Sequence, residues 1–167
     1  TRHERIGATD DNIFILSESN TDNAENAILD MRPDLIIVDS IQTLLSSNSE
    51  GRIGSPSQVT EVANLFTSLA KNLNIPTLMI GHLTKSDSIA GPRVVEHLVD
   101  VVLYLEASPD STLRMLRGIK NRFGSTDEVG LFEHADNGLL EINDPSGFFT
   151  NPHADDVSGY ATTIMVE

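Results

Sequence analysis

The segment "KNRFG" (residues 120–124) sets two cations two positions apart, next to an amide, an aromatic ring and a glycine. The chain has a formal net charge of −14, yet four of its 11 Lys and Arg residues fall within residues 114–122. Residues i and i+2 of an extended segment share a face, so Lys120 and Arg122 should project together. Two adjacent cations repel each other unless an anion lies against them, and a triphosphate or a nucleic-acid backbone meets that need. Pairing with surface carboxylates of this acidic chain is the alternative.

A second candidate for phosphate chemistry is the carboxylate that ends the apolar run "LIIVDS", residues 35–40. Such a run predicts a buried strand, and the ligands of open parallel sheets bind beyond the carboxyl ends of the strands. Asp39 could therefore hold Mg²⁺ through a water molecule, with Ser40 beside it. The alternative is that Asp39 caps the turn that follows the strand.

The next apolar run ends in "MIGHLTK", residues 79–85, and brings His82 to the same predicted edge of the sheet as Asp39. An imidazole at a neighbouring strand end can sense a phosphate bound beside Asp39, although a lone histidine is more often structural. Ser40, His82 and one of the aspartates also suggest a serine hydrolase. No G-x-S-x-G elbow surrounds any serine, which argues against that activity.

Two polar, glycine-bearing loops follow these predicted strands, "SSNSEGRIGS" (residues 46–55) and "KSDSIAGPR" (residues 85–93). Long loops in compact domains tend to be functional or disordered. Arg52, Lys85 and Arg93 are candidates for contact with a phosphate backbone. These loops could equally be inert surface.

Four short apolar runs predict the strands that position these side chains, and they cover residues 12–17, 34–40, 75–81 and 99–106. They are apolar at both odd and even positions, which suits a sheet covered on both faces by helices. Helical segments between them indicate right-handed βαβ units and an α/β fold with a mainly parallel sheet. Asn137-Gly138, between two later apolar runs, predicts an antiparallel hairpin near the C-terminus.

The strongest helix signal is "SPSQVTEVANLFTSLAKNL", with Ser55 as N-cap, Pro56 at the first helical position and Gln58 completing a capping box. Its apolar residues keep the spacing of one buried stripe. A second helix is predicted over residues 22–31, with Asp22 opening a weaker capping box. A third, short helix is predicted from Gly91-Pro92 through "RVVEHLV".

Length and composition limit the number of domains, the kinds of site and the location that we expect. The chain has 167 residues, 39% of them hydrophobic, which predicts one globular domain, with a boundary near residues 148–158. The absence of cysteine excludes a disulfide or a thiolate zinc site within these residues. No run approaches the roughly 18 apolar residues of a membrane span, so we expect a cytoplasmic protein. The first residue is Thr1, and we expect the chain to be a piece of a longer protein.

Four segments that carry these candidates resemble the RadA (Sms) family of bacterial DNA-repair ATPases, a RecA-like branch of the phosphate-loop ATPases. They are "DLIIVDSIQTL" (34–44), "IPTLMIGHLTK" (75–85), "IAGPRVVEHLVDVVLYLE" (89–106) and "LRGIKNRFGSTDEVGLFE" (116–133). The resemblance runs from about Arg2 to Val166. No G-x-x-x-x-G-K-[ST] phosphate loop occurs in the chain, although the family needs one to bind nucleotide.

The resemblance implies a partial RecA-like ATPase core, mainly a parallel sheet flanked by helices, with a C-terminal antiparallel hairpin. Residues 1–150 would be the C-terminal two-thirds of that core, and residues 151–167 a linker and the start of a Lon-protease-like domain. A cysteine-rich zinc motif, the phosphate loop and a catalytic glutamate would lie upstream. We therefore expect the 167 residues alone to hydrolyse ATP negligibly.

Family roles carry over residue by residue. The resemblance implies that Asp39, beside Ser40, is the Mg²⁺-associated carboxylate of an ATP site and that His82 senses the γ-phosphate. Lys120 and Arg122 match signature cations that reach a neighbouring subunit's nucleotide, and DNA is an additional or alternative target. Residues 46–55 and 85–93 correspond to the two DNA-facing loops, which makes Arg52, Lys85 and Arg93 candidate DNA contacts.

The function implied by the resemblance is a DNA-dependent ATPase of recombinational repair. It would act as a hexameric ring that drives branch migration on single-stranded DNA in recombination intermediates, alongside the RecA recombinase. The alternative is a non-catalytic RecA-like module that binds nucleotide or partner proteins as a scaffold. The sequence before Thr1 would separate the two, because only the motor needs an intact phosphate loop.

Overall fold

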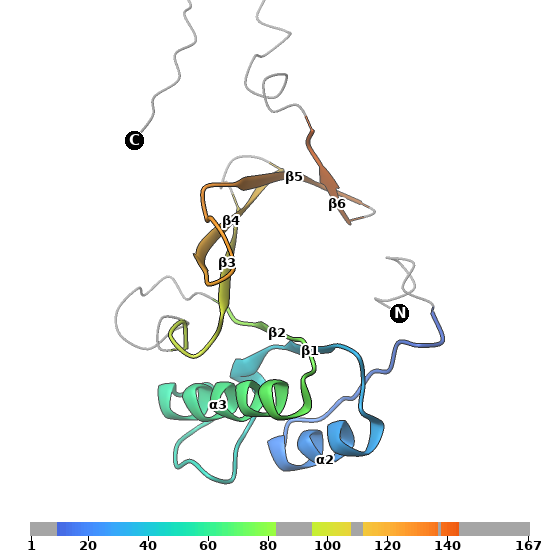
Figure 1. The fold of residues 1–167 in the computed structure, drawn as a ribbon, viewed down its shortest axis with the longest axis vertical. Helices are drawn as coiled ribbons and strands as arrows, with labels where there is room; N and C mark the ends of the chain where they lie inside the picture. The colour runs from blue at the N-terminus through green and yellow to red at the C-terminus, as the bar shows by residue number, and fades with distance from the viewer. Residues whose placement is uncertain (1–9, 83–94, 108–111, 137, 144–167) are drawn as a thin grey trace, which may run out of the picture. The chain divides into compact units, whose positions relative to one another are not determined.

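The computed structural model describes residues 10–82, 95–107, 112–136 and 138–143 (Figure 1). The predicted boundary near residues 148–158 lies outside them. The described residues form two units. The first unit comprises residues 10–82, 95–102 and 120–124, and the second comprises residues 103–107, 112–119, 125–136 and 138–143.

The first helix of the first unit, α2, spans Thr21–Met31 and matches the prediction to within one residue. Its N-cap is Asn20, whose side chain accepts a hydrogen bond from the backbone N–H of Asp22 at 2.7 Å, so Asp22 is not the cap. The helix ends at Arg32, which adopts a left-handed conformation with φ 51°. Pro33 follows and disfavours a further helical turn.

The second helix, α3, spans Pro56–Leu73, as its apolar spacing predicts. Pro56 occupies the first turn, where its missing N–H costs nothing. The predicted capping box is wrong. Ser55 makes no side-chain capping bond, and the Gln58 side chain binds backbone groups of residues 46–49 instead of the Ser55 N–H. The apolar stripe of α3 is buried: Val59, Val62, Ala63, Phe66 and Leu69.

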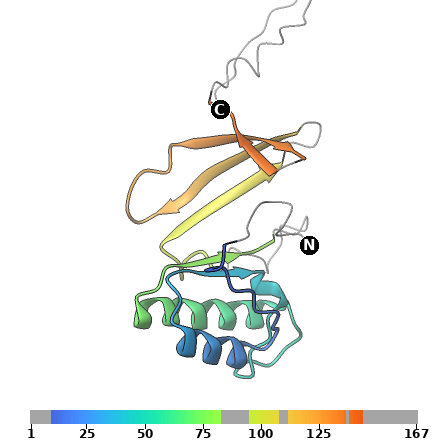
Figure 2. The same cartoon turned by 90° about the vertical axis from the view of Figure 1, so that its right-hand side faces the viewer.

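Strands β1 (Ile36–Asp39) and β2 (Thr77–Ile80) pair in parallel, with Ile36 opposite Thr77 and Asp39 opposite Ile80. Both helices lie on the same side of this strand pair (Figures 1 and 2). Ile36 and Val38 point to that side and are buried with the apolar stripe of α3. The complete buried cluster is Ala24, Ile28, Ile36, Val38, Ile41, Leu44, Val59, Val62, Ala63, Phe66, Leu69, Ile75 and Val95.

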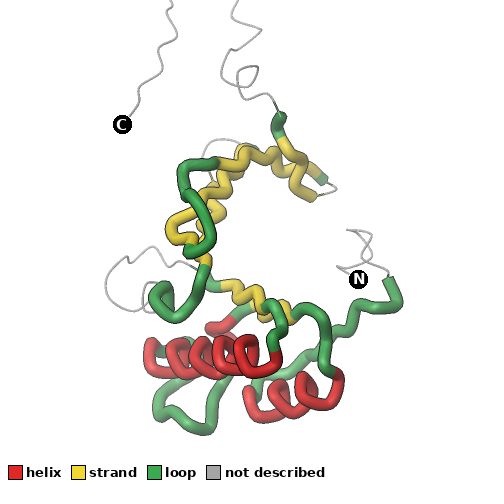
Figure 3. Tube along the Cα trace, viewed as in Figure 1, coloured by secondary structure: helices red, strands yellow, loops and turns green. Residues whose placement is uncertain are grey.

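Within this unit, the opposite face of the pair is not covered by described residues. Ile37 on β1 is 59% exposed and Leu78 on β2 is 51% exposed. The predicted coverage of both sheet faces is therefore absent from the described part of this unit. The strand predicted over residues 12–17 is also absent, and this segment is a loop (Figure 3) with Ile13 to Leu16 exposed. Without a neighbouring strand to bond, an apolar run cannot form a ladder.

The other sheet contains four strands in the order β3-β4-β5-β6: β3 Val101–Ala107, β4 Leu113–Asn121, β5 Val129–Ala135 and β6 Gly138–Glu141. β4 pairs antiparallel with β5, and β5 pairs antiparallel with β6. The hairpin predicted at Asn137-Gly138 is confirmed by the β5–β6 pairing, and Gly138 has the φ of 127° that favours glycine.

Two predictions about residues 91–106 differ from the structure. The run at 99–106 forms β3, a neighbour of β4, so it does not extend the parallel β1–β2 pair. The helix predicted from Gly91-Pro92 falls partly outside the described residues, and residues 95–98 form a turn closed by Leu98 N–H and Val95 C=O at 3.0 Å. The described fold is therefore mixed α/β, with the parallel pairing confined to β1 and β2.

Candidate functional site

The end of β1 presents a carboxylate to solvent. Asp39 is exposed, its carboxylate forms no hydrogen bond to the described residues, and its peptide bond to Ser40 is cis. Ser40 is 4% exposed and is the N-cap of the 3-10 turn η1, which spans Ile41–Thr43. The backbone carbonyl of Ser40 accepts hydrogen bonds from Thr43, at 3.1 Å from its N–H and at 2.8 Å from its hydroxyl. The predicted alternative, that Asp39 caps this turn, is wrong because Ser40 occupies the cap.

His82 lies at the same edge of the strand pair. Asp39, the last residue of β1, lies opposite Ile80, the last residue of β2. His82 follows Ile80 by two residues, so it lies just beyond the same end of the strand pair. Gln42 in η1 links the two strand ends, because its Nε2 donates to the His82 carbonyl at 3.2 Å. The His82 residue is exposed. The structure thus brings Asp39 and His82 to a common edge, as their positions after two apolar runs predict.

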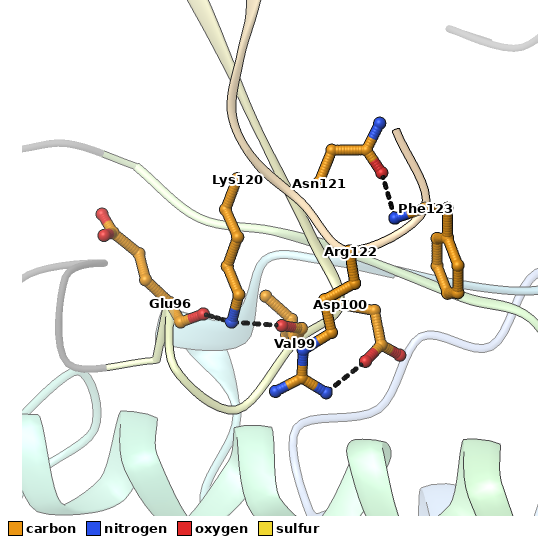
Figure 4. Close-up of polar contacts among 7 residues, drawn as sticks. All are labelled: Glu96, Val99, Asp100, Lys120, Asn121, Arg122 and Phe123. Carbon is orange, nitrogen blue, oxygen red and sulfur yellow. Dashed lines mark hydrogen bonds and ion pairs between the residues drawn. The ribbon is translucent and has the colours of Figure 1, made fainter. Parts of the chain in front are cut away.

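The cations of "KNRFG" both point toward residues 96–100 (Figure 4). Lys120 Nζ donates to the backbone carbonyls of Glu96 at 2.9 Å and Val99 at 2.8 Å. Arg122 Nη1 forms an ion pair with Asp100 Oδ1 at 2.7 Å, and the Arg122 backbone N–H donates to the Asp100 carbonyl at 3.1 Å. The predicted alternative of pairing with a carboxylate therefore holds for Arg122, whereas Lys120 binds carbonyl dipoles.

Between and after the two cations, Asn121 and Phe123 form a tight turn. The Asn121 side chain accepts a hydrogen bond from the Phe123 backbone N–H at 3.0 Å, which fixes the bend at the end of β4. The ring of Phe123 is 81% exposed. No role for this ring was predicted from the sequence, and an aromatic residue between a cation and a glycine was the available signal.

The loop of residues 46–55 is built onto the first turn of α3. Gln58 has no exposed surface, and its Nε2 donates to the carbonyls of Ser46 at 3.1 Å and Ser49 at 2.5 Å. Its Oε1 accepts from the Ser46 N–H at 2.8 Å. Sequence reasoning missed this role because the spacing from Ser55 to Gln58 also fits a capping box.

The candidate DNA contacts are only partly described. Arg52 lies on the loop of residues 46–55 and is exposed, with no ion pair to the described residues. Gly51 and Gly54 on either side of it have positive φ values of 129° and 77°, which a side chain would strain. Lys85 and Arg93 lie outside the described residues, as does most of the loop of residues 85–93.

Basic residues earlier in β4 belong to the second unit and have separate contacts. Arg117 Nη2 pairs with Glu106 Oε1 on β3 at 2.8 Å, and Arg114 Nη1 donates to the Leu113 carbonyl at 2.9 Å. In the part of the chain that is described, no three His, Asp or Glu side chains gather as a metal site. A Mg²⁺ ion at Asp39 would therefore depend on water and phosphate for its remaining ligands. None of the described helices combines the length and apolar character needed to cross a membrane.

Comparison with known proteins identifies homologues of this chain, which the contacts alone do not reveal. No family model matches the sequence. DNA repair protein RadA of Streptococcus pyogenes serotype M3 is 43% identical over 166 residues, which cover 99% of this chain and 37% of the relative. The RadA proteins of Mycolicibacterium smegmatis and Bacillus subtilis strain 168 are each 42% identical and also match 99% of this chain. The chain is therefore homologous, over nearly its whole length, to a segment of bacterial DNA repair protein RadA, and it spans about 37% of the relatives' length.

Proposed function

We propose that this chain is part of the RecA-like ATPase core of a RadA-type DNA repair protein that uses ATP to move along single-stranded DNA. Homology to proteins named DNA repair protein RadA supports the role in repair. The observation that carries the proposal is the common edge of β1 and β2. There the exposed carboxylate of Asp39 ends one strand and His82 follows the other.

Each residue at this edge has a defined task in the proposed reaction, in which water attacks the γ-phosphate of ATP in line. Asp39 fits a Mg²⁺ held through water, because its exposed carboxylate is not engaged by the described residues. When bound, the ion supplies positive charge to the phosphates. His82 would sense the γ-phosphate, and Ser40 fixes the turn behind Asp39 through its carbonyl. Lys120 and Arg122 of a neighbouring subunit would neutralise charge in the transition state.

The proposed DNA contacts are Arg52, Lys85 and Arg93, together with Lys120 and Arg122. The chain is acidic overall, so single-stranded DNA would meet local basic loops in the channel of a hexameric ring. Within recombination intermediates the motor would drive branch migration alongside the RecA recombinase. The support for these partners is the RadA homology together with the exposed, unpaired Arg52 in the described loop.

A second candidate function is a non-catalytic RecA-like scaffold. One observation favours it: both cations of "KNRFG" already have partners in their own chain. In that case Lys120 and Arg122 would only hold residues 96–100 in place. The two functions differ in whether Lys120 and Arg122 also bind phosphate.

The test uses a polypeptide of the RadA relatives' full length that contains this chain. ATP hydrolysis would be measured with and without single-stranded DNA for wild type, Lys120→Ala and Arg122→Ala, with Arg117→Ala as the control. The motor predicts DNA-stimulated hydrolysis that both variants of "KNRFG" lower by at least about tenfold and that Arg117→Ala retains. Absence of hydrolysis, or hydrolysis that responds neither to DNA nor to these substitutions, would select the scaffold.

A further inference from the structure

The ion pair between Arg122 and Asp100 leaves most of the guanidinium available. Only Arg122 Nη1 contacts the carboxylate, at 2.7 Å from Asp100 Oδ1, and this is the one side-chain contact of Arg122 within the described part of the chain. A guanidinium carries five N–H donors in a fixed plane. The side chains of Arg122 and Asp100 are 52% and 44% exposed, and the other guanidinium donors of Arg122 have no partner among the described residues.

Asp100 is held in place by backbone contacts on both sides. Its own carbonyl accepts from the Arg122 N–H at 3.1 Å, and strand β3 begins at the next residue. Lys120 Nζ binds the carbonyl of Val99, the residue before Asp100, and that of Glu96, four residues before it. Figure 4 shows these contacts together, with Lys120 Nζ between the carbonyls of Glu96 and Val99 and the Arg122 guanidinium against the Asp100 carboxylate. The backbone of Asp100 is therefore anchored beside Arg122, and its carboxylate provides the acceptor toward which the flexible Arg122 side chain is oriented.

We propose that Asp100 is a positioning residue that aims the Arg122 guanidinium at a phosphate group. The single bond to Asp100 restricts the rotamers of Arg122, and the free donors can still bind phosphate in the bidentate manner that favours arginine. The carboxylate need not leave when the phosphate binds. This inference rests on the proposed function, because that function supplies the phosphate, from either a nucleotide or a nucleic-acid backbone.

The described residues offer a matched control for this pair. Arg117 Nη2 and Glu106 Oε1 also form a single contact, at 2.8 Å, with side chains that are 47% and 34% exposed. That pair joins the middle of β4 to β3, away from the bend of "KNRFG". Removing Glu106 therefore deletes an ion pair of similar length and exposure without touching Asp100.

The experiment measures binding by the full-length protein, so that it does not depend on catalysis. Wild type, Asp100→Asn, Asp100→Ala, Arg122→Ala, the Asp100→Ala/Arg122→Ala double variant and Glu106→Ala would be titrated with a fluorescent oligo-dT and, separately, with a fluorescent non-hydrolysable ATP analogue. The affected ligand identifies the source of the phosphate. Thermal unfolding of each variant would confirm that the fold is retained.

We expect Arg122→Ala and Asp100→Ala each to lower the affinity for one of these ligands by about tenfold, which is the cost of losing a charge-assisted hydrogen bond. Asp100→Asn keeps an acceptor for Arg122 and should lose less. The double variant should be no weaker than Arg122→Ala, because both substitutions remove one interaction. Glu106→Ala should stay within about twofold of wild type.

Two results would overturn the inference. Asp100→Ala could bind like wild type while Arg122→Ala binds weakly, which would mean that Arg122 needs no positioning. Tighter binding by Asp100→Ala would show that the carboxylate masks Arg122 instead. Failure of the proposed function looks different, because wild type itself would then bind neither ligand or show no hydrolysis that depends on DNA.

Discussion

Gln58 binds both backbone polar groups of Ser46, twelve residues earlier in the chain, with its Oε1 on the Ser46 N–H and its Nε2 on the Ser46 carbonyl. A third bond joins the same Nε2 to the Ser49 carbonyl. The side chain has no exposed surface. Through these bonds α3 fixes the start of the loop that carries Arg52.

Replacing Gln58 by Ala should lower the free energy of unfolding by about 2 to 4 kcal/mol, because the buried backbone groups of Ser46 and the half-buried carbonyl of Ser49 lose their partners. Urea denaturation followed by circular dichroism measures the change. Asn72→Ala is the matched control on the exposed side of α3 and should cost no more than about 0.5 kcal/mol. Equal costs for the two variants would contradict a role for Gln58 in holding the loop.

Lys120 should stabilise the fold even without a phosphate ligand. Lys120→Met keeps the aliphatic stem but leaves the carbonyls of Glu96 and Val99 without their donor. We expect a loss of about 1 to 3 kcal/mol in the free energy of unfolding.

Arg122→Ala removes a half-exposed ion pair and should lower the free energy of unfolding by no more than about 1 kcal/mol. If Lys120→Met unfolds at the wild-type urea concentration, the two carbonyl bonds contribute nothing to stability.

Truncation of two adjacent residues of β1 should lower the free energy of unfolding by different amounts. Val38 is 8% exposed and packs in the buried cluster, so Val38→Ala should cost about 2 kcal/mol through lost burial and a cavity. Ile37 is 59% exposed, so Ile37→Ala in the 167-residue chain should cost less than about 1 kcal/mol. The same two substitutions in a full-length polypeptide would show whether another segment covers the outer face of β1. A large cost of Ile37→Ala there, but not here, would show that another segment packs on β1.

The carboxylate of Glu18 should make α2 sensitive to acid. Hydrogen bonds from the Asn20 N–H, the Asn23 side chain and the Ser19 N–H lower the pKa of Glu18 below its usual value. A lowered pKa in the folded state means that this stabilisation is present above the unfolded-state pKa and is lost as pH falls through the folded-state pKa.

Glu18→Gln should therefore flatten the acid side of the stability profile, measured by urea denaturation between about pH 6 and pH 3. Glu61→Gln serves as the control, since Glu61 lies on α3 and has no such set of donors among the described residues. A profile for Glu18→Gln that matches wild type at every pH would contradict the linkage.

The 167 residues alone should release phosphate from ATP no faster than ATP hydrolyses in buffer without protein. They contain Asp39 and His82 but no G-x-x-x-x-G-K-[ST] loop, whose backbone and lysine bind the phosphates in this class of ATPase. A coupled phosphate-release assay with and without oligo-dT measures this directly. A robust rate that Asp39→Asn abolishes would show that the chain binds nucleotide by another route.

Local signals were enough to predict several elements. The apolar stripe and Pro56 predicted α3, and Asn137-Gly138 predicted the β5–β6 hairpin, because helix periodicity and tight turns depend on neighbours in sequence. The common edge that holds Asp39 and His82 also followed from sequence, since parallel strands end on the same side.

Partners that lie far apart in the sequence could not be predicted as well. The run at residues 12–17 has the composition of a strand but no pairing partner among the described residues, and the run at 99–106 pairs within the β3–β6 sheet. Gln58 had two possible partners, the N-cap Ser55 and the loop of residues 46–49. Composition and spacing cannot choose between partners of equal chemistry.

The sequence by itself therefore determined which residues could bind phosphate, because charge and hydrogen-bonding capacity belong to the side chain. It also determined α2, α3 and the β5–β6 hairpin, which form from contacts between near neighbours. Only the tertiary structure decided that Lys120 binds the carbonyls of Glu96 and Val99 and that Arg122 binds Asp100, more than twenty residues away. A cation accepts any nearby oxygen, so its partner is set by which distant segment the fold brings within reach.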